Sequence, residues 1–183
     1  MELGQHPASL VILTGERGSG KTALCSLLVE QGRKAGWQVR GLMTPAVFED
    51  GQKTAINVQD LHSGEQCLLA RVRQAGDAGI QTTYWTFDSL ALEWGSRILK
   101  ESVPCDLLLV DELGPLELLR KQGWTAGLDV LESGNFRLGV VVIRPELLEI
   151  ACQRWPHARQ ITVISPDGTS DLANQICSEY GMI

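Results

Sequence analysis

Short apolar runs and amphipathic helical patterns alternate along this chain. Residues 9–14, 106–111 and 137–143 are almost wholly apolar, which is typical of parallel strands buried on both faces. Apolar residues at helical spacing follow Lys21 and Pro145. The alternation predicts an α/β fold, in which a mostly parallel sheet flanked by helices forms one domain over all 183 residues.

A helix is expected after Asp88, which is a suitable N-cap residue. Leu90, Trp94 and Ile98 then recur every fourth residue. Ala91 extends this stripe, and we expect all four side chains in the core. Trp94 could instead stack on a nucleobase, but its register with leucine and isoleucine favours packing.

Residues 45–83 interrupt the α/β alternation. Pro45 ends a strand expected over residues 37–44, because proline cannot donate a hydrogen bond to a continuing ladder. An Asp-Gly pair at positions 50–51 lies between two extended segments and signals a tight β-hairpin. Residues 67–71 could add a short strand. The pattern predicts a small antiparallel insertion that does not belong to the parallel core.

The candidate chemistry begins in the glycine-rich segment after the first strand. This segment reads Gly-Glu-Arg-Gly-Ser-Gly-Lys-Thr and fits the phosphate-binding loop (P-loop) pattern. Its residues are Gly15, Glu16, Arg17, Gly18, Ser19, Gly20, Lys21 and Thr22. The order of strand, loop and helix brings backbone N–H groups and the positive end of a helix to a phosphate. An ordinary glycine turn would explain neither the lysine nor the threonine, so the pattern predicts a nucleoside-triphosphate site (ATP, GTP or another base).

Three residues are expected to hold the phosphates and a Mg²⁺ cofactor. Lys21 places its ammonium on the β- and γ-phosphates, and the Thr22 hydroxyl coordinates the metal. Asp111 closes the apolar run of residues 106–111 and supplies a carboxylate for the metal shell. Standing alone, an acid at a strand end would be interpreted as a helix cap or an exposed side chain. The P-loop earlier in the chain favours the catalytic role.

Glu112 decides the class of reaction. It follows Asp111 directly, and neighbouring side chains of an extended strand point in different directions, so one acid can face metal while the other faces substrate. Glu112 is therefore expected to orient and polarise an attacking water, although a nucleotide kinase can also place an acid near its acceptor. Arg17 and Arg144 are candidates to neutralise charge on the γ-phosphate, and a plain surface role stays open for each.

Several segments resemble the THEP1-type P-loop nucleoside-triphosphatases. Residues 41–45 and 84–88 look like the family's Gly-Phe-x-Thr and Tyr-x-Phe-Asp segments. Residues 111–118, Asp-Glu-Leu-Gly-Pro-Leu-Glu-Leu, are similar to its Asp-Glu-Ile-Gly-Pro-Met-Glu-Leu signature. The resemblance implies a RecA-like fold and Mg²⁺-dependent hydrolysis of nucleoside triphosphates to diphosphates and phosphate, with loose base preference. Residues 165–170 depart from the family's Asn-Arg segment, and base preference will differ here if they contact the base.

Composition excludes several other classes of protein. The formal net charge of -6 argues against a surface built to hold nucleic acid. The five cysteines contain no Cys-x-x-Cys pair and are expected to be free thiols. No apolar run approaches membrane-spanning length, so neither a membrane partner nor a signal segment is expected, and the protein is predicted to be cytoplasmic.

Two other functions remain open at this stage. One is a small-molecule or nucleotide kinase, in which residues 45–83 hold the acceptor, although Arg71 and Arg73 are its only close arginine pair. The other is a nucleotide-dependent adaptor that changes protein partners between bound states and hydrolyses slowly.

Overall fold

A computed structural model describes residues 8–182 and contains one mixed sheet of nine strands. The strands are β1 (Ser9–Thr14), β2 (Val39–Met43), β3 (Ala46–Glu49), β4 (Gln52–Asp60), β5 (Gln66–Val72), β6 (Trp85–Phe87), β7 (Cys105–Val110), β8 (Phe136–Val142) and β9 (Arg159–Thr162). Their order is β6-β5-β4-β2-β7-β8-β1-β9, and β3 pairs with β4. Strands β2, β7, β8, β1 and β9 pair in parallel, which confirms the predicted fold class.

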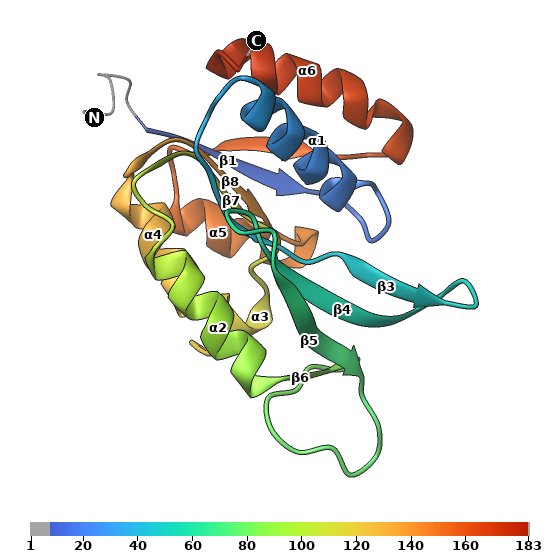
Figure 1. The fold of residues 1–183 in the computed structure, drawn as a ribbon. Helices are drawn as coiled ribbons and strands as arrows, with labels where there is room; N and C mark the ends of the chain where they lie inside the picture. The colour runs from blue at the N-terminus through green and yellow to red at the C-terminus, as the bar shows by residue number, and fades with distance from the viewer. Residues whose placement is uncertain (1–7, 183) are drawn as a thin grey trace.

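Helices cover both faces of the sheet (Figure 1). They are α1 (Lys21–Lys34), α2 (Ser89–Lys100), α3 (Pro115–Leu118), α4 (Thr125–Ser133), α5 (Leu148–Arg154) and α6 (Thr169–Tyr180), with single 3-10 turns η1 (Pro145–Leu147) and η2 (Pro166–Gly168). Helices α1 and α6 lie together on one face, and α2, α4 and α5 lie on the other (Figure 1). None of the helices in residues 8–182 is long and apolar enough to cross a membrane.

Strand β7 shows why its sequence is apolar at consecutive positions. Leu107 and Leu109 pack into the cluster under α1 and α6, whereas Leu108 and Val110 pack into the cluster under α2, α4 and α5. Side chains of a strand alternate between the two faces of a sheet, and here both faces are covered. A continuous apolar run is therefore required at the centre of the sheet, as the sequence predicted.

The antiparallel strands extend the core sheet. The hairpin of β3 and β4 turns at Asp50 and Gly51, both of which have positive φ, as the Asp-Gly pair predicted. However, β4 also pairs with β2 through Leu42–Asp60 and Met43–Gln59, and β5 and β6 continue outward from β4. The hairpin therefore lies outside the parallel core, as predicted, but it continues the same sheet. Pairing with β4 satisfies N–H and C=O groups on the open side of β2 that the sequence pattern does not reveal.

Helix α2 begins as predicted, but its most buried side is rotated away from Leu90. The Asp88 carboxylate accepts a hydrogen bond from the Ala91 N–H at 2.8 Å, which confirms the N-cap. The buried residues of the helix are Ala91, Leu92, Gly95 and Leu99. Trp94 and Ile98 are partly buried and pack against the core cluster, whereas Leu90 is 73% exposed, so the predicted stripe was wrong at Leu90.

Trp124 provides the physical reason for this rotation. A Cβ atom on Gly95 would lie 2.6 Å from Trp124 Nε1, so only glycine lets the indole approach the helix this closely. The same Nε1–H donates to the Leu92 carbonyl at 3.2 Å. The indole thereby fixes the Leu92 and Gly95 side of α2 toward the core.

Candidate active site

Four neighbouring parallel strands end at one edge of the sheet, in the order β2, β7, β8 and β1. The P-loop follows β1, Arg144 lies two residues beyond β8, and Asp111 and Glu112 follow β7. Carboxyl ends of parallel strands meet at one edge, which is where ligands bind in open α/β sheets. The structure therefore brings together the three segments that the sequence singled out.

The P-loop is a compact turn held by its own lysine. The Lys21 ammonium donates to the carbonyl of Gly15 at 2.6 Å and to that of Glu16 at 2.7 Å. Gly15 has a φ of 144°, and a Cβ there would lie 2.2 Å from the Val163 carbonyl oxygen. A side chain at this position would collide with the strand end beside it, which explains the first glycine of the pattern.

Three buried polar atoms at this edge make no hydrogen bond among residues 8–182. They are Thr14 Oγ1 at the end of β1, Ser19 Oγ in the P-loop and Asp111 Oδ2 directly after β7. Buried polar atoms without partners are costly, and in native proteins each calls for an explanation such as a water, an ion or a ligand. A bound phosphate or metal would supply the missing partners.

Asp111 is a buried carboxyl, 2% exposed, whose pKa is raised to about 7 by burial and by the negative charge of Glu112. The Thr22 hydroxyl and the Thr44 N–H lower the same pKa as hydrogen-bond donors, and the Lys21 charge adds to them. Thr22 and Asp111 thus stand close together with oxygen atoms of the kind that Mg²⁺ prefers.

The donor set fits Mg²⁺ in a nucleotide complex. Residues 8–182 contain no group of three or more His, Cys, Asp or Glu side chains that could hold a metal ion. Mg²⁺ at phosphate sites is held by one or two protein oxygens together with phosphates and waters. Thr22 and Asp111 could provide those protein oxygens, with the remaining positions left to the substrate and solvent.

Glu112 and Arg144, which the sequence analysis treated separately, form an ion pair. Arg144 Nε donates to Glu112 Oε1 at 2.6 Å, and the two side chains are 43% and 27% exposed. Because the pair is partly solvated, its contribution to stability is small. Its effect is to fix the direction of the carboxylate, while Oε2 makes no hydrogen bond to the described residues and can meet a water.

The buried carboxyl of Asp111 leads to a prediction about stability in the absence of metal and nucleotide. The folded pKa of about 7 lies above the ordinary value of 3.8, so this group's stabilising contribution is full below pH 3.8 and is lost as the pH rises through 7. Asp111→Asn should therefore raise the Tm at pH 8 by about 5 °C, and should flatten the fall in Tm between pH 5 and pH 8.

Thermal unfolding in EDTA at both pH values measures this effect. Asp129→Asn, which changes an exposed carboxylate on α4, serves as the control and should leave the Tm profile of the wild type unchanged. Equal Tm values for Asp111→Asn and wild type at pH 8 would show that the Asp111 carboxylate is not destabilising in the folded protein.

Glu117 has a structural role that sequence reasoning missed. Its buried carboxylate accepts hydrogen bonds from the N–H groups of Gly114 and Trp124, each at 2.9 Å. Burial raises the pKa of this carboxyl, and the two N–H donors oppose that rise. Pro115 at the start of α3 with an acid two residues later is the available sequence signal. Through these two hydrogen bonds, Glu117 stabilises the conformation of the segment that follows Glu112.

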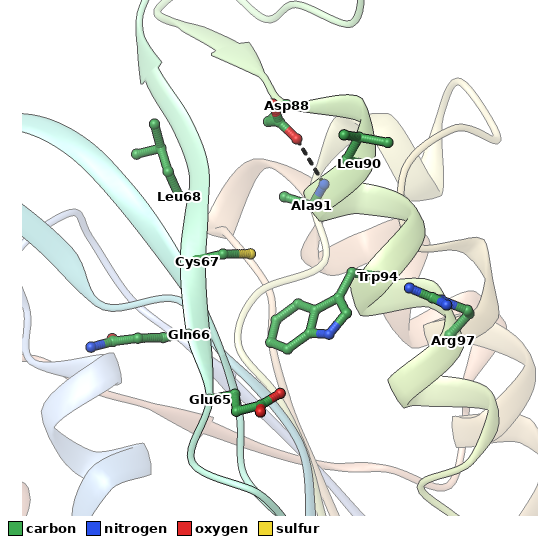
Figure 2. A pocket seen from close by; sticks show the side chains of 9 residues that line it. All are labelled: Glu65, Gln66, Cys67, Leu68, Asp88, Leu90, Ala91, Trp94 and Arg97. Carbon is green, nitrogen blue, oxygen red and sulfur yellow. Dashed lines mark hydrogen bonds between the residues drawn. The ribbon is translucent and has the colours of Figure 1, made fainter.

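A separate hollow lies between β5 and α2 and includes the Trp94 ring (Figure 2). Strands β4, β2, β7 and β8 separate β5 from β1, which corresponds to about 24 Å at the usual strand spacing. The Trp94 indole therefore does not reach the P-loop. Its stacking on the base of a nucleotide held there, which the sequence analysis left open, is not supported.

Comparisons with known proteins agree with this geometry. The family model described as NTPase matches residues 10–176. The nucleoside-triphosphatase THEP1 of Methanosarcina acetivorans is 27% identical over 171 residues, which cover 93% of this chain and 95% of that protein. The THEP1 of Korarchaeum cryptofilum is 29% identical over 169 residues, which cover 90% of this chain and 83% of that protein.

The fold also has a counterpart among solved structures. The solution structure of a human cancer-related nucleoside triphosphatase matches with a TM-score of 0.68 and 23% identity, covering 93% of this chain and 96% of that one. This likeness shows a shared fold. Together with the family match, it confirms the resemblance seen in the sequence motifs.

Proposed function

Because this chain belongs to the NTPase family, we propose that it hydrolyses nucleoside triphosphates to diphosphates and phosphate in a Mg²⁺-dependent reaction. Family membership makes the protein a nucleoside-triphosphatase. One observation carries the metal dependence and the residue roles: the P-loop with Lys21 and Thr22 shares a sheet edge with Asp111 and the Glu112–Arg144 pair.

The residues of this edge divide the work of phosphoryl transfer. The P-loop N–H groups and Lys21 bind the β- and γ-phosphate oxygens. Thr22 and Asp111 hold Mg²⁺, which neutralises charge on those oxygens when it is bound. Glu112 orients a water toward the γ-phosphorus and accepts its proton. The new P–O bond forms as the bond to the β-phosphate oxygen breaks, and the diphosphate leaves.

Arg144 and Arg17 act around this centre. Arg144 holds one oxygen of Glu112 and so keeps the other directed at the water. Its remaining guanidinium N–H groups, together with those of the exposed Arg17, are the candidates for contact with the γ-phosphate. In this proposal Arg144 is first a positioning residue.

Loose base preference is supported by the surface next to the P-loop. Pro166 and Thr169 lie directly against Gly20 of the P-loop. A Cβ atom on Gly20 would lie 2.9 Å from Thr169 Cγ2 and 3.0 Å from Pro166 Cα. The segment that departs from the family pattern thus lies beside the phosphate site. Ile164, just before it, is 87% exposed and offers an apolar contact that any base can use.

A hydrolysis assay over ATP, GTP, CTP and UTP tests the proposal. We expect phosphate release without an added acceptor, rates within about tenfold across the four bases, and loss of activity in EDTA. Transfer of labelled phosphate to a metabolite instead of water would identify a kinase. Full activity in EDTA would refute the metal dependence.

A further inference from the structure

The buried carboxylate of Glu117 joins the segment that carries Glu112 to the next helix. Its Oε2 accepts the Gly114 N–H and its Oε1 accepts the Trp124 N–H, each at 2.9 Å. Gly114 lies two residues after Glu112, and Trp124 is the N-cap of α4. Because the side chain is only 5% exposed, solvent does not compete for these two bonds.

The surroundings of this carboxylate require two acceptor oxygens. Gly123 has a φ of 67°, and a Cβ atom there would lie 2.2 Å from Glu117 Oε1, so only glycine lets the chain turn this close to the oxygen. An ionised carboxylate accepts hydrogen bonds at both oxygens, whereas an amide of the same shape offers one acceptor and one donor. Glutamine at position 117 could therefore satisfy only one of the two N–H groups.

Three backbone hydrogen bonds fix the chain around Glu112. The Asp111 N–H donates to a carbonyl of β2 at 3.0 Å, and the Leu113 N–H donates to the last carbonyl of β8 at 3.1 Å. The third is the bond from the following N–H to the Glu117 carboxylate. Only this third acceptor is a side chain, so it can be removed by substitution without changing the strands.

A capping box for α3 is the ordinary interpretation of the contact between Glu117 and Gly114. However, α3 has only four residues, so there is little helix for a cap to stabilise. The second N–H, from Trp124, lies outside this helix. The carboxylate therefore holds a longer piece of chain than α3 alone, and that piece begins beside Glu112.

We propose that Glu117 is a positioning residue for hydrolysis, which holds the backbone next to Glu112 so that the Glu112 carboxylate stays directed at the attacking water. This rests on the function proposed above. Arg144 fixes the far end of the Glu112 side chain, and Glu117 fixes the chain from which that side chain extends. A displacement of about 1 Å in a catalytic group can cost about 10²-fold in rate. The phosphates bind to other residues, so their affinity should not depend on Glu117.

Steady-state hydrolysis of Mg²⁺–ATP and calorimetric titration with its β,γ-imido analogue provide the first test. Glu117→Gln should lower kcat by about tenfold or more, and should leave KM and the affinity for the analogue within about twofold of wild type. Glu117→Asp keeps two acceptor oxygens on a side chain that is one methylene shorter. It should show the same split between kcat and affinity, and it provides the measurement if the glutamine variant does not fold.

A double-mutant cycle with Glu112→Gln distinguishes positioning from a general loss of structure. In single-turnover hydrolysis, Glu112→Gln and the double variant Glu112→Gln/Glu117→Gln should differ by less than about twofold, because no carboxylate is left to position. An effect on folding alone would slow both backgrounds by the same factor.

Asp60→Asn is the matched control, because the buried Asp60 carboxylate also accepts two backbone N–H groups, those of His62 at 2.8 Å and Ser63 at 3.2 Å. It should lower the Tm as Glu117→Gln does, but leave kcat at the wild-type value. Wild-type kcat in Glu117→Gln would overturn the proposal. An equal loss of rate in both backgrounds, or a parallel loss of analogue affinity, would also overturn it. If the wild type released no phosphate from ATP, the proposed function itself would fail.

Discussion

Glu112→Gln is expected to lower kcat by about 10²–10⁴-fold, the usual contribution of a general base. The amide keeps the shape of the carboxylate, and its oxygen can still accept the Arg144 hydrogen bond, which spans 2.6 Å in the native pair. It cannot take a proton from the attacking water. Binding of the Mg²⁺–triphosphate complex should stay within about threefold of wild type, because the P-loop, Thr22 and Asp111 are unchanged.

Single-turnover hydrolysis and calorimetric titration together separate these two effects. Glu146→Gln is a suitable control, because Glu146 is an exposed glutamate in η1, two residues beyond Arg144. It should hydrolyse nucleotide at the wild-type rate. If Glu112→Gln did the same, the water would be activated by another group and Glu112 would act only through its ion pair.

Lys21→Ala is expected to lower kcat/KM by about 10²-fold or more and to weaken triphosphate binding as well. Two effects combine in this variant. The ammonium charge on the β- and γ-phosphates is lost, and so are the hydrogen bonds from Lys21 to the carbonyls of Gly15 and Glu16, at 2.6 and 2.7 Å. Without those bonds the loop is less well organised to accept an anion, so the affinity for triphosphate falls as well as the rate of hydrolysis.

Steady-state kinetics and analogue titration measure the two losses. Lys34→Ala removes an exposed lysine from the same helix, where it pairs with Glu30, and should leave both quantities unchanged. The two lysines differ in position along α1 and not in charge. Retained triphosphate affinity in Lys21→Ala would therefore mean that the phosphates do not bind at the P-loop.

Local sequence patterns determined the part of the molecule that binds phosphate. The order β1, glycine loop, α1 depends on residues that are close in sequence, and each signal is physical: an apolar strand, glycines at positive φ, and a lysine that closes the turn. The central strands could also be predicted from the sequence, since a strand buried on both faces needs a continuous apolar run. The Asp88 cap and the Asp-Gly turn are also local signals, because each depends on interactions between residues a few positions apart.

Three elements escaped sequence reasoning. Helix α3 is a single turn, β6 has three residues, and α4 is buried at most of its positions, so none shows a clear period. Leu90 of α2 was wrongly placed in the core because a distant residue, Trp124, decides which side of the helix is most deeply buried. The hairpin joined the core sheet for a similar reason, because the open edge of β2 becomes visible only when the sheet is assembled.

The sequence by itself therefore determined the fold class, the P-loop and the acids that follow the central strand. Only the tertiary structure decided which charged side chains contact each other at the carboxyl edge of the sheet. Arg144 and Glu112 are 32 residues apart, yet they form one ion pair. Contacts of this kind depend on which strands lie next to each other, and strand order is set by packing over the whole sheet and not by any local pattern.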